Sequence, residues 1–437
     1  MSGTLRIGLA GLGTVGTGVL RLLEAHGKDI SKRVSRPLEV VGVSAQSQSK
    51  DRGVDISQFE WFDDPVTLAG SADIDVFVEL IGGEEGVSKT SVEAALSRGI
   101  NVVTANKALL AHHGGELALL GEQNGANILF EAAVAGGIPI VKAMRESLSG
   151  NAFGRVYGIL NGTCNYILSR MEREGSNFAD VLADAQKLGY AEADPSFDIG
   201  GVDTAHKLAL LTSLAYGTKV DFSSIYIEGI ETITSADIEA ASDFGYRIKL
   251  LGVSQKTETG IEQRVHPTLV PKGSAIAEVG DVFNAVVVEG DFVGEVMLVG
   301  RGAGAEPTAS AVVGDIIEVA RGDTVATFGR PASTLTSYEP AGMRAHEGGY
   351  YVGLMVLDRP GAMAAIAKRM ADQNISLDSI RQRSRSPTRE TDMPAKPVPI
   401  MLITHETTEI SVRAAIEEIE RDGHITGRAQ MIRIEPT

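Results

Sequence analysis

Hydrophobic positions in the first 140 residues alternate between short β-type runs and stretches with helical spacing. The strand candidates are LRIGLAG (5–11), LEVVGVSA (38–45), IDVFVELI (74–81), INVVTA (100–105) and ANILFEAAV (126–134). Between them, VGTGVLRLLEAHG (15–27) and KTSVEAALSRG (89–99) repeat apolar residues at helical spacing. Such alternation of strands and helices is typical of a parallel sheet covered by helices. We therefore expect an α/β domain with a parallel sheet over residues 1–135.

The pattern changes beyond residue 150. The apolar runs RVYGILNG, YIEGI, IKLLGVSQ, QRVHPTLV, NAVVVEG and GEVMLVG predict a mixed or antiparallel sheet with helices on one side. We assign this α+β domain to residues 136–340. Within it, a helix near 305–322 follows a glycine-rich stretch, and we expect it to return to the first domain. The last unit, 348–437, has the order βαββαβ and could fold by itself.

Composition narrows the classes of partner. The 437 residues suffice for two or three domains, and 40 basic against 57 acidic residues give a net charge of −17. This charge argues against a nucleic-acid or anionic-membrane partner, because phosphate binding needs a positive face. The basic run RQRSRSPTRE (381–390) has no interleaved aromatic residues, so a solvated hairpin loop is the better interpretation.

Other features favour a cytoplasmic enzyme. The N-terminal MSGTLRIGLA enters a strand pattern directly, without the basic and apolar regions of a signal peptide. No apolar run approaches the roughly 20 residues that cross a bilayer. The single cysteine, Cys164, excludes an intramolecular disulfide and a cysteine-rich metal site, which suits a reducing compartment.

The motif GLGTVG (11–16) fits the G-x-G-x-x-G pattern of dinucleotide-binding loops. It follows a predicted strand and opens a predicted helix, which is the context that this pattern requires. Gly11 permits the tight turn, Gly13 lets the backbone approach a pyrophosphate, and Gly16 allows the helix to pack on the strand. The helix N-terminus then faces the negative charge. The alternative is a glycine-rich turn that binds nothing.

The end of the second predicted strand bears on the choice of cofactor. NAD sites usually have an acidic residue there for the ribose 2′-hydroxyl, but this chain has Ser44, Ala45 and Gln46. Lys50 and Arg52 follow and could meet a 2′-phosphate. The residues therefore favour NADP slightly over NAD. The other interpretation of the two cations is a solvated loop.

TANKALL (104–110) lies where the fourth predicted strand ends and a helix begins. Ligands of open α/β sheets bind at this edge, so Thr104, Asn106 and Lys107 could face the nicotinamide or the substrate. A cation at a helix N-terminus is slightly unfavourable for the helix dipole, which indicates that Lys107 has another role. The alternative is an ammonium group in solvent.

Four carboxylates and one lysine are concentrated in GYAEADPSFDIGGVDTAHK (189–207). Asp203 and Lys207 are four residues apart and share a helix face, whereas Glu192, Asp194 and Asp198 precede them on a bent loop. Carboxylates can hold a substrate ammonium while a lysine transfers a proton at a hydroxyl oxygen. This points to an amino-acid substrate. The alternative is an acidic solvent loop with an ordinary surface salt bridge.

This stretch, with TANKALL, EAAVAGGIPI (131–140) and GILNGTCNYIL (158–168), closely resembles the homoserine dehydrogenase family over the chain through about residue 340. Residues 348–425 resemble an ACT domain, a small ligand-sensing module. The resemblance implies an α/β protein with a Rossmann-like NAD(P)-binding domain, a central α+β catalytic and dimerisation domain, and a C-terminal βαββαβ ACT domain. It implies reversible NAD(P)-dependent reduction of L-aspartate 4-semialdehyde to L-homoserine, in threonine, methionine and isoleucine biosynthesis.

The resemblance also assigns roles to residues of this chain. Lys207 matches the proton donor to the substrate oxygen, and Lys107 matches a lysine near the nicotinamide and substrate. The implied substrate-binding residues are Glu192, Asp198, Asp203, Thr163 and Tyr190. The implied cofactor-binding residues are Gly11, Gly13, Thr14, Val15, Gly16, Thr104, Lys107 and Gly302. A structural sodium ion, held mostly by backbone oxygens, maps to Glu131, Val134, Gly136 and Ile138, a shell that suits a hard cation.

Two positions depart from the family pattern. Many members have an arginine after the second strand where this chain has Ala45 and Gln46, and NGTCN has a cysteine where a small residue is common. Cys164 could be the nucleophile of a phosphorylating aldehyde dehydrogenase, but small buried cysteines are commonplace. The pair His112–His113 is better explained as a helix-surface feature than as metal ligands.

The ACT-like unit predicts regulation. Its strand–turn–helix junction LDRPGAMAAIA (357–367) matches the place where ACT domains bind an amino acid, with Asp358 and Gly361 as effector-site residues and threonine as the effector. The alternative is a purely structural or dimer-forming appendage. The family implies a homodimer or homotetramer. A different class remains open, a nucleotide-bound amino-acid sensor that has lost catalysis.

Overall fold

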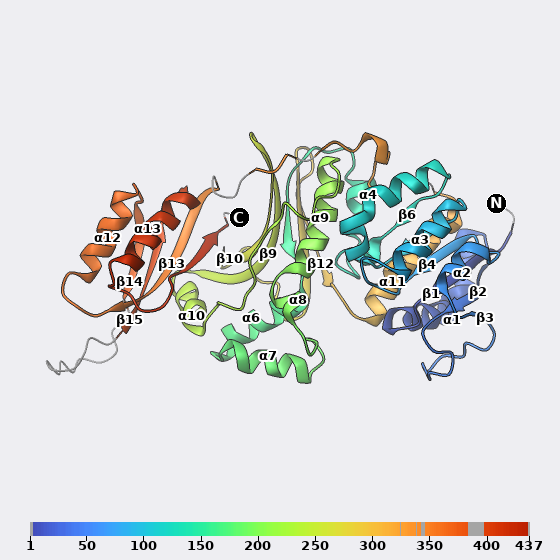
Figure 1. Cartoon of the computed structure of the whole chain (residues 1–437), viewed down its shortest axis with the longest axis horizontal. Helices are drawn as coiled ribbons and strands as arrows, with labels where there is room; N and C mark the ends of the chain where they lie inside the picture. The colour runs from blue at the N-terminus through green and yellow to red at the C-terminus, as the bar shows by residue number, and fades with distance from the viewer. Residues whose placement is uncertain (1–2, 324, 338, 342–345, 383–396, 436–437) are drawn as a thin grey trace.

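The computed structural model describes residues 3–323, 325–337, 339–341, 346–382 and 397–435. The molecule is elongated, with the N-terminal α/β unit at one end, a large sheet in the middle and the C-terminal unit at the other end (Figure 1). Most of RQRSRSPTRE lies outside the described residues, and so does the predicted hairpin loop. None of the helices built from described residues combines the length and apolar character needed to cross a bilayer.

The N-terminal sheet has six strands in the order β3-β2-β1-β4-β5-β6, and all its pairs are parallel. Its strands are β1 Leu5–Ala10, β2 Leu38–Ser44, β3 Glu60–Phe62, β4 Val76–Glu79, β5 Asn101–Thr104 and β6 Ile128–Leu129. The chain leaves β1 at the point where the strand order reverses, which is where open α/β sheets bind nucleotides. This confirms the predicted Rossmann-like sheet.

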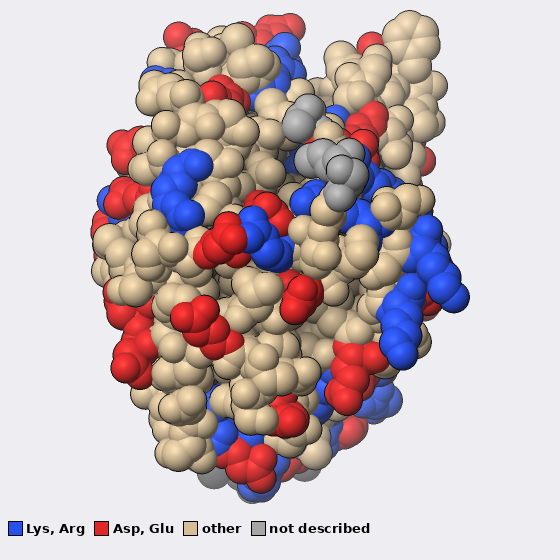
Figure 2. Space-filling view, turned by 90° about the vertical axis from the view of Figure 1, so that its right-hand side faces the viewer, with Lys and Arg blue, Asp and Glu red and all other residues tan. Residues whose placement is uncertain are grey.

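Helices cover both faces of this sheet. They are α1 Thr14–Val34, α2 Pro65–Ser71, α3 Val87–Ser97, α4 Lys107–Gln123 and the late helix α11 Ala305–Arg321. Helix α11 packs on α1 at Gly18, where an added Cβ would lie 3.1 Å from both the Ala305 carbonyl oxygen and the Ala309 Cβ. A glycine inside α1 is therefore explained by the close approach of a helix almost 300 residues later. Basic and acidic side chains are interspersed over the face at this end of the molecule (Figure 2).

The fifth predicted strand is much shorter than expected. Strand β6 ends at Leu129, and a 3₁₀ turn, η1 Glu131–Ala133, follows it. The Glu131 carboxylate accepts hydrogen bonds from the backbone N–H groups of Val141 and Lys142. These bonds stabilise a turn of the chain after β6. Positive φ angles of 55° at Ala135 and 48° at Gly136 continue the turn. The prediction of a strand through residue 134 was wrong, because these contacts to later residues override β propensity.

The middle of the molecule is an antiparallel sheet in the order β12-β11-β7-β9-β10. Its strands are β7 Phe153–Ile159, β9 Tyr246–Thr257, β10 Gly260–Pro271, β11 Phe283–Gly290 and β12 Gly294–Arg301, with the short β8 Tyr226–Ile227 beside β10. The helical elements of this part are α5 Ile140–Lys142, the π-helix η2 Ala143–Ser147, α6 Gly162–Glu174, α7 Phe178–Lys187, α8 Ser196–Ile199, α9 Val202–Tyr216 and α10 Ser235–Asp243. A 3₁₀ turn, η3 Ala332–Thr334, comes later.

The C-terminal unit has the predicted βαββαβ order. It consists of β13 Glu347–Leu357, α12 Ala362–Asp372, β14 Leu377–Gln382, β15 Pro397–Thr404, α13 Glu409–Arg421 and β17 Gln430–Ile434, with the short β16 Thr407–Thr408. Strand β17 pairs with β13 on one side and runs parallel to β10 on the other. The central and C-terminal strands therefore form one continuous sheet, a connection that the sequence pattern did not reveal. The domain limits at 135 and 340 stay predictions.

Candidate active site

The glycine loop between β1 and α1 is shaped by close backbone contacts. Gly11 has a φ of 99°, and a Cβ there would lie 2.3 Å from the Leu80 carbonyl oxygen. A Cβ on Gly16 would lie 2.0 Å from the carbonyl oxygen of Gly11. Gly13, in contrast, has open space around its missing Cβ, and it caps α1 without a side chain. The N-terminal N–H groups of α1 are thus accessible to a phosphate.

A cavity of about 370 Å³ lies beside this loop. Its wall includes Gly11 and Gly13, the residues after β2 from Ser44 to Ser47, and the cations Lys50 and Arg52. Arg52 donates hydrogen bonds to the carbonyl oxygens of Leu12, Ser47 and Lys50, and so ties the loop after β2 to the glycine loop. The open approach for a pyrophosphate and the two cations in the wall fit a dinucleotide.

The TANKALL segment at the end of β5 organises the neighbouring loops. The buried hydroxyl of Thr104 donates to the Glu79 carboxylate at 2.6 Å, and Glu79 also accepts from the N–H groups of Ile81 and Gly82. Asn106 caps α4 through the N–H of Leu109. Thr104 and Asn106 therefore hold loops in place with their side chains, and Lys107 extends from the helix start toward Asp203.

Two lysines converge on one buried carboxylate. The Nζ of Lys207 donates to Asp203 Oδ2 at 2.7 Å and to the carbonyl oxygen of Leu160 at 2.6 Å. The Nζ of Lys107 lies 3.2 Å from Asp203 Oδ1. Lys207 and Asp203 belong to α9, Leu160 follows β7, and Lys107 begins α4, so the cluster joins the nucleotide-binding sheet to the central domain. The Lys207 side chain is 9% exposed, and it does not point into bulk water.

The charges in this cluster keep Asp203 ionised. Burial by itself raises the pKa of Asp203, but Lys207, Lys107 and hydrogen bonds from Lys207 and Asn161 outweigh burial and hold that pKa well below its usual range. An ammonium has three N–H donors, and two of those on Lys207 are used by Asp203 and Leu160. Among the described residues no third acceptor binds this ammonium group.

A second carboxylate lies next to this cluster. The side-chain amide of Asn161 donates to Asp198 and to Asp203, at 2.9 Å in both cases. Thr163 donates to the Tyr190 carbonyl oxygen at 2.7 Å and to Asp198 at 3.3 Å. Burial raises the pKa of Asp198, and repulsion from Asp203 adds to the rise. A cationic ligand here would favour the ionised carboxylate.

Comparisons with known proteins agree with this geometry. Family models for the homoserine dehydrogenase NAD-binding domain, for homoserine dehydrogenase and for the ACT domain match residues 11–131, 139–317 and 350–424. A homoserine dehydrogenase of Neisseria gonorrhoeae is 43% identical over an alignment of 439 positions, which covers 99% of this chain and 98% of the relative. The chain belongs to the homoserine dehydrogenase family.

Solved structures of the family share this architecture. The crystal structure of a homoserine dehydrogenase from Thiobacillus denitrificans has a TM-score of 0.92 and 42% identity, with coverage of 100% of this chain and 99% of that one. A hyperthermophilic archaeal homoserine dehydrogenase in complex with NADPH has a TM-score of 0.62 and 27% identity, with coverage of 72% and 97%. The protein is thus an NAD(P)-dependent oxidoreductase that acts on a CH–OH group, with a C-terminal ACT domain.

Three other residues of the predicted homoserine dehydrogenase site have different surroundings. Glu192 is exposed, and its backbone carbonyl accepts from the Gln186 side chain. Tyr190 is 46% exposed, and its ring packs on Tyr166 with a centroid distance of 4.8 Å. Gly302 is buried, and an added Cβ there would lie 2.0 Å from the Asn284 amide nitrogen.

The segment predicted to bind sodium in homoserine dehydrogenases has the tight turn described above. Glu131 is buried, and burial together with the charge of Asp315 raises its pKa to about 7. Gly136 lies against the backbone of Gly302, so a Cβ there would lie 2.5 Å from that residue's carbonyl oxygen. Within the described residues no group of three His, Cys, Asp or Glu side chains could hold a metal ion.

The remaining candidate residues of this homoserine dehydrogenase have structural partners. The thiol of Cys164 is buried against the Asp198 carbonyl oxygen, and burial raises its pKa, which disfavours a thiolate nucleophile. His113 pairs with Glu85 at 2.7 Å and His112 with Glu84 at 3.1 Å. These contacts fit a helix-surface role rather than a ligand pair.

Sequence reasoning missed two residues that hold the site together. Asn161 bridges Asp198 and Asp203, and Glu79 fixes the loop after β4. Asn161 belongs to the NGTCN motif, and an asparagine before a helix is a usual N-cap. The sequence could therefore predict its position at the helix start, but not its contacts with Asp198 and Asp203. Glu79 ends a buried strand, and a carboxylate there indicates a specific partner.

Proposed function

We propose that this enzyme reversibly reduces L-aspartate 4-semialdehyde to L-homoserine with NADP as the preferred cofactor. The observation that carries the proposal is the convergence of Lys107 and Lys207 on Asp203 at the carboxyl edge of the nucleotide-binding sheet. Family membership supports the substrate. The bound nicotinamide supplies or accepts the hydride at the substrate carbon.

Lys207 is the proposed proton donor in the reducing direction. The N–H group of Lys207 that neither Asp203 nor Leu160 occupies would donate to the aldehyde oxygen and transfer its proton as the hydroxyl forms. In the oxidising direction the same nitrogen takes the hydroxyl proton back. Asp203 orients the ammonium, and Lys107 helps to position the substrate oxygen and the nicotinamide ring.

The amino-acid part of the substrate would bind beside this pair. Asp198 is held by Asn161 and Thr163, and its carboxylate is suited to the substrate ammonium. Glu192 lies on the preceding loop, and we propose that it completes the ammonium site together with Tyr190. This assignment explains why the carboxylates of Asp198 and Asp203 are held close together, although the charge of Asp203 disfavours that of Asp198.

The preference for NADP rests on the wall of the nucleotide cavity. Lys50 and Arg52 line it, and the strand β2 ends at Ser44 without the acidic residue of NAD sites. The archaeal relative solved with NADPH supports the same cofactor. We expect replacement of Lys50 by Ala to raise the KM for NADP more than that for NAD, with the exposed Lys28→Ala as the matched control.

Further parts of the proposal concern ions, regulation and assembly. We propose a structural sodium ion at the backbone oxygens of Glu131, Val134, Gly136 and Ile138, in the turn after β6. Threonine is the proposed effector at the ACT turn, where Asp358 precedes Gly361, which caps α12 with a φ of 90°. The proposed assembly is a homodimer or homotetramer, and the proposed setting is cytoplasmic threonine, methionine and isoleucine biosynthesis.

The test is an absorbance assay at the nicotinamide band. Purified enzyme is given homoserine with NADP or with NAD, in sodium and in potassium buffer, with and without threonine. We expect turnover with both cofactors, a higher kcat/KM with NADP, and lower activity when threonine is added. Tight binding of NADPH and threonine without any turnover of homoserine would instead indicate a sensor that has lost catalysis.

A further inference from the structure

A second cavity, of about 470 Å³, lies where the central sheet meets the ACT domain. Its floor comes from the central strands, with Arg155 on β7 and Arg264 on β10. Its other side comes from the ACT domain, with the start of β13 at Gly348–Gly349 and the end of β17 at Glu435. The volume falls within the usual range of small-ligand sites, roughly 300–1,000 Å³.

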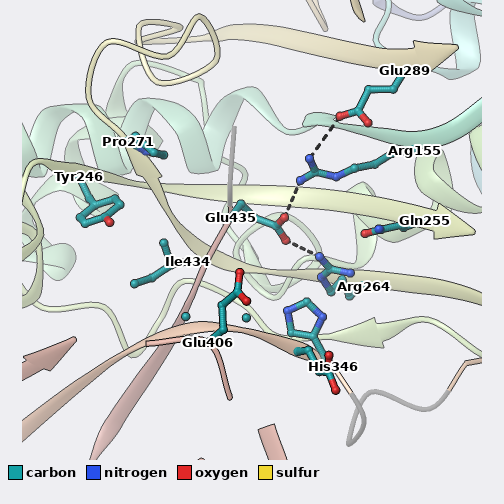
Figure 3. A pocket seen from close by; sticks show the side chains of 13 residues that line it. Arg155, Tyr246, Gln255, Arg264, Pro271, Glu289, His346, Glu406, Ile434 and Glu435 are labelled. Atoms are coloured by element: carbon teal, nitrogen blue, oxygen red, sulfur yellow. Dashed lines mark hydrogen bonds and ion pairs between the residues drawn. The ribbon is translucent and has the colours of Figure 1, made fainter. Parts of the chain in front are cut away.

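Charged and apolar groups occupy different ends of this junction cavity (Figure 3). Tyr246, Pro271 and Ile434 lie together at one end, and Arg155, Gln255, Arg264 and His346 lie at the other, with Glu406 and Glu435 between them. A ligand that fills the space needs a charged head and an apolar tail.

The charged residues in the wall of the junction cavity determine which charged head group a ligand can have. The two arginines already have partners: Glu435 pairs with both, Glu289 lies 3.3 Å from Arg155 and Glu262 lies 2.9 Å from Arg264. Glu435 is buried, and although burial raises its pKa, the two arginines hold the pKa below its usual value.

Glu406 differs from these paired carboxylates. It is exposed on the ACT side of the wall, and among the described residues its carboxylate has no ion-pair or hydrogen-bond partner. A positive group is favoured over a lone anion, because four carboxylates line the cavity against the guanidinium groups of Arg155 and Arg264. The four carboxylates are those of Glu289, Glu347, Glu406 and Glu435. The described residues offer no three-carboxylate or histidine group that could hold a metal ion there.

We propose that the junction cavity binds a free α-amino acid with an apolar side chain. The ammonium group binds Glu406 and Glu435, and the carboxylate accepts from the Gln255 amide and from guanidinium N–H groups at the same end. The apolar side chain packs against Tyr246 and Ile434.

This site is separate from the proposed threonine site of the ACT domain. The junction cavity lies at the start of β13, whereas Asp358 and Gly361 follow its end. Eleven residues of strand separate them, which is roughly 35 Å. A ligand in the junction cavity also touches β7, whose end leads to Leu160, the hydrogen-bond acceptor of Lys207. Binding of a ligand in the junction cavity does not depend on the threonine proposal.

The test is calorimetric titration of the full-length enzyme with L-leucine, compared with glycine and with 4-methylpentanoate. Glycine lacks the apolar side chain, and 4-methylpentanoate lacks the ammonium. We expect saturable binding of leucine and at least tenfold weaker binding of both comparison compounds. Absence of saturable leucine binding at millimolar concentration would overturn the proposal, and so would equal affinity for 4-methylpentanoate.

Variants locate the site. Glu406→Gln should weaken leucine binding at least tenfold, while Glu417→Gln, an exposed change on α13, should leave it unchanged. Asp358→Asn should also leave it unchanged. Full leucine affinity in Glu406→Gln, or its loss in Asp358→Asn, would contradict the assignment to the junction cavity. Unfolding temperatures of the variants show whether each one is folded.

Discussion

At position 203, one buried carboxylate balances two ammonium groups. The Asp203 side chain is 7% exposed and contacts both Lys207 and Lys107. Its pKa is depressed in the folded protein, so its contribution to stability is fully present above the unfolded value near 4 and is lost as the pH falls through the folded pKa. At neutral pH the whole contribution is therefore available to a mutational test.

Replacing Asp203 by Asn should destabilise the protein at pH 7. The change leaves the buried Lys207 ammonium and the half-buried Lys107 ammonium without their carboxylate. Removal of one partner from a buried pair typically costs about 3–5 kcal/mol. Denaturant unfolding of Asp203→Asn measures this loss. The control is Asp194→Asn, where the carboxylate accepts from the Ser196 N–H on an exposed loop and the change should be small. Equal stability of the two variants would show that the lysine cluster contributes nothing to folding.

His206 introduces a pH dependence of stability. Its ring contacts Phe222 with a centroid distance of 4.5 Å and lies near His112, and burial, His112 and Lys107 lower its pKa to about 4. In the unfolded chain His206 takes up a proton as the pH falls below about 6.5. In the folded protein it takes up this proton only near pH 4. Stability therefore falls as the pH drops through this window.

His206→Phe should remove this loss, because phenylalanine keeps the ring packing and cannot be protonated. Between pH 7 and pH 5, the unfolding free energy of the variant should decrease less steeply with falling pH than that of the wild type. The difference in slope corresponds to at most one proton taken up on unfolding. His26→Phe, at an exposed position of α1, is the control. Parallel pH profiles of wild type and His206→Phe would contradict the lowered pKa.

The sequence alone predicted the side-chain contacts of some residues but not of others. The i, i+4 spacing of Asp203 and Lys207 on a helix was sufficient to predict their pairing, because helix geometry is local. The contact of Lys107 with Asp203 joins residues 96 positions apart, so only the family resemblance could suggest it. The hydroxyl of Thr104 binds Glu79, a contact that depends on how two strands lie side by side and that the sequence pattern does not show.

Among the elements, the loop between β1 and α1 contains glycines that serve two different purposes. Gly16 is needed for folding, because a Cβ there would lie 2.0 Å from the Gly11 carbonyl oxygen. Gly13 has open space around its missing Cβ, so folding does not require a glycine there, and we propose that its lack of a side chain serves the approach of a pyrophosphate.

Gly13→Ala and Gly16→Ala form a matched pair that tests this difference. Gly13→Ala should keep the unfolding temperature close to that of the wild type and weaken NADPH binding at least tenfold. Gly16→Ala should lower the unfolding temperature clearly. Fluorescence titration with NADPH and thermal unfolding of both variants give the comparison. A Gly13→Ala enzyme that binds NADPH normally would show that the loop does not hold the pyrophosphate.

Elements with strong periodicity were predictable, and those fixed by distant contacts were not. Apart from β3 and the end of β6, the strands of the N-terminal and central sheets lie where apolar runs indicated them. Strand β3, of three residues, was missed because it is too short for a pattern. The end of β6 was misjudged because the Glu131 carboxylate binds residues ten and eleven positions later.

For the whole molecule, the order of strands around β17 is the main feature that the sequence could not show. The βαββαβ pattern indicates a unit that folds alone, but β17 also pairs with β10 of the central sheet. Next to this pairing, the buried Glu435 contacts both Arg155 and Arg264. Pairing across two domains is fixed by tertiary packing, and periodicity within one strand carries no information about it.

Glu435→Gln should therefore destabilise the junction. Arg155 and Arg264 would lose a shared carboxylate but keep Glu289 and Glu262, so we expect a loss of about 3 kcal/mol, at the low end for a buried pair. Urea unfolding of Glu435→Gln beside Glu417→Gln measures the difference. An unchanged midpoint in Glu435→Gln would mean that the two domains hold together without this contact.

The measurement that tests the central claim most directly is single-turnover hydride transfer in Lys207→Ala. Enzyme saturated with NADPH is mixed with aspartate 4-semialdehyde, and loss of nicotinamide absorbance is followed beside wild type and Lys187→Ala, a change of an exposed lysine on α7. If Lys207 donates the proton, the rate should fall by about 10²–10⁴-fold in Lys207→Ala while NADPH affinity stays the same. A rate near that of the wild type in Lys207→Ala would contradict the claim.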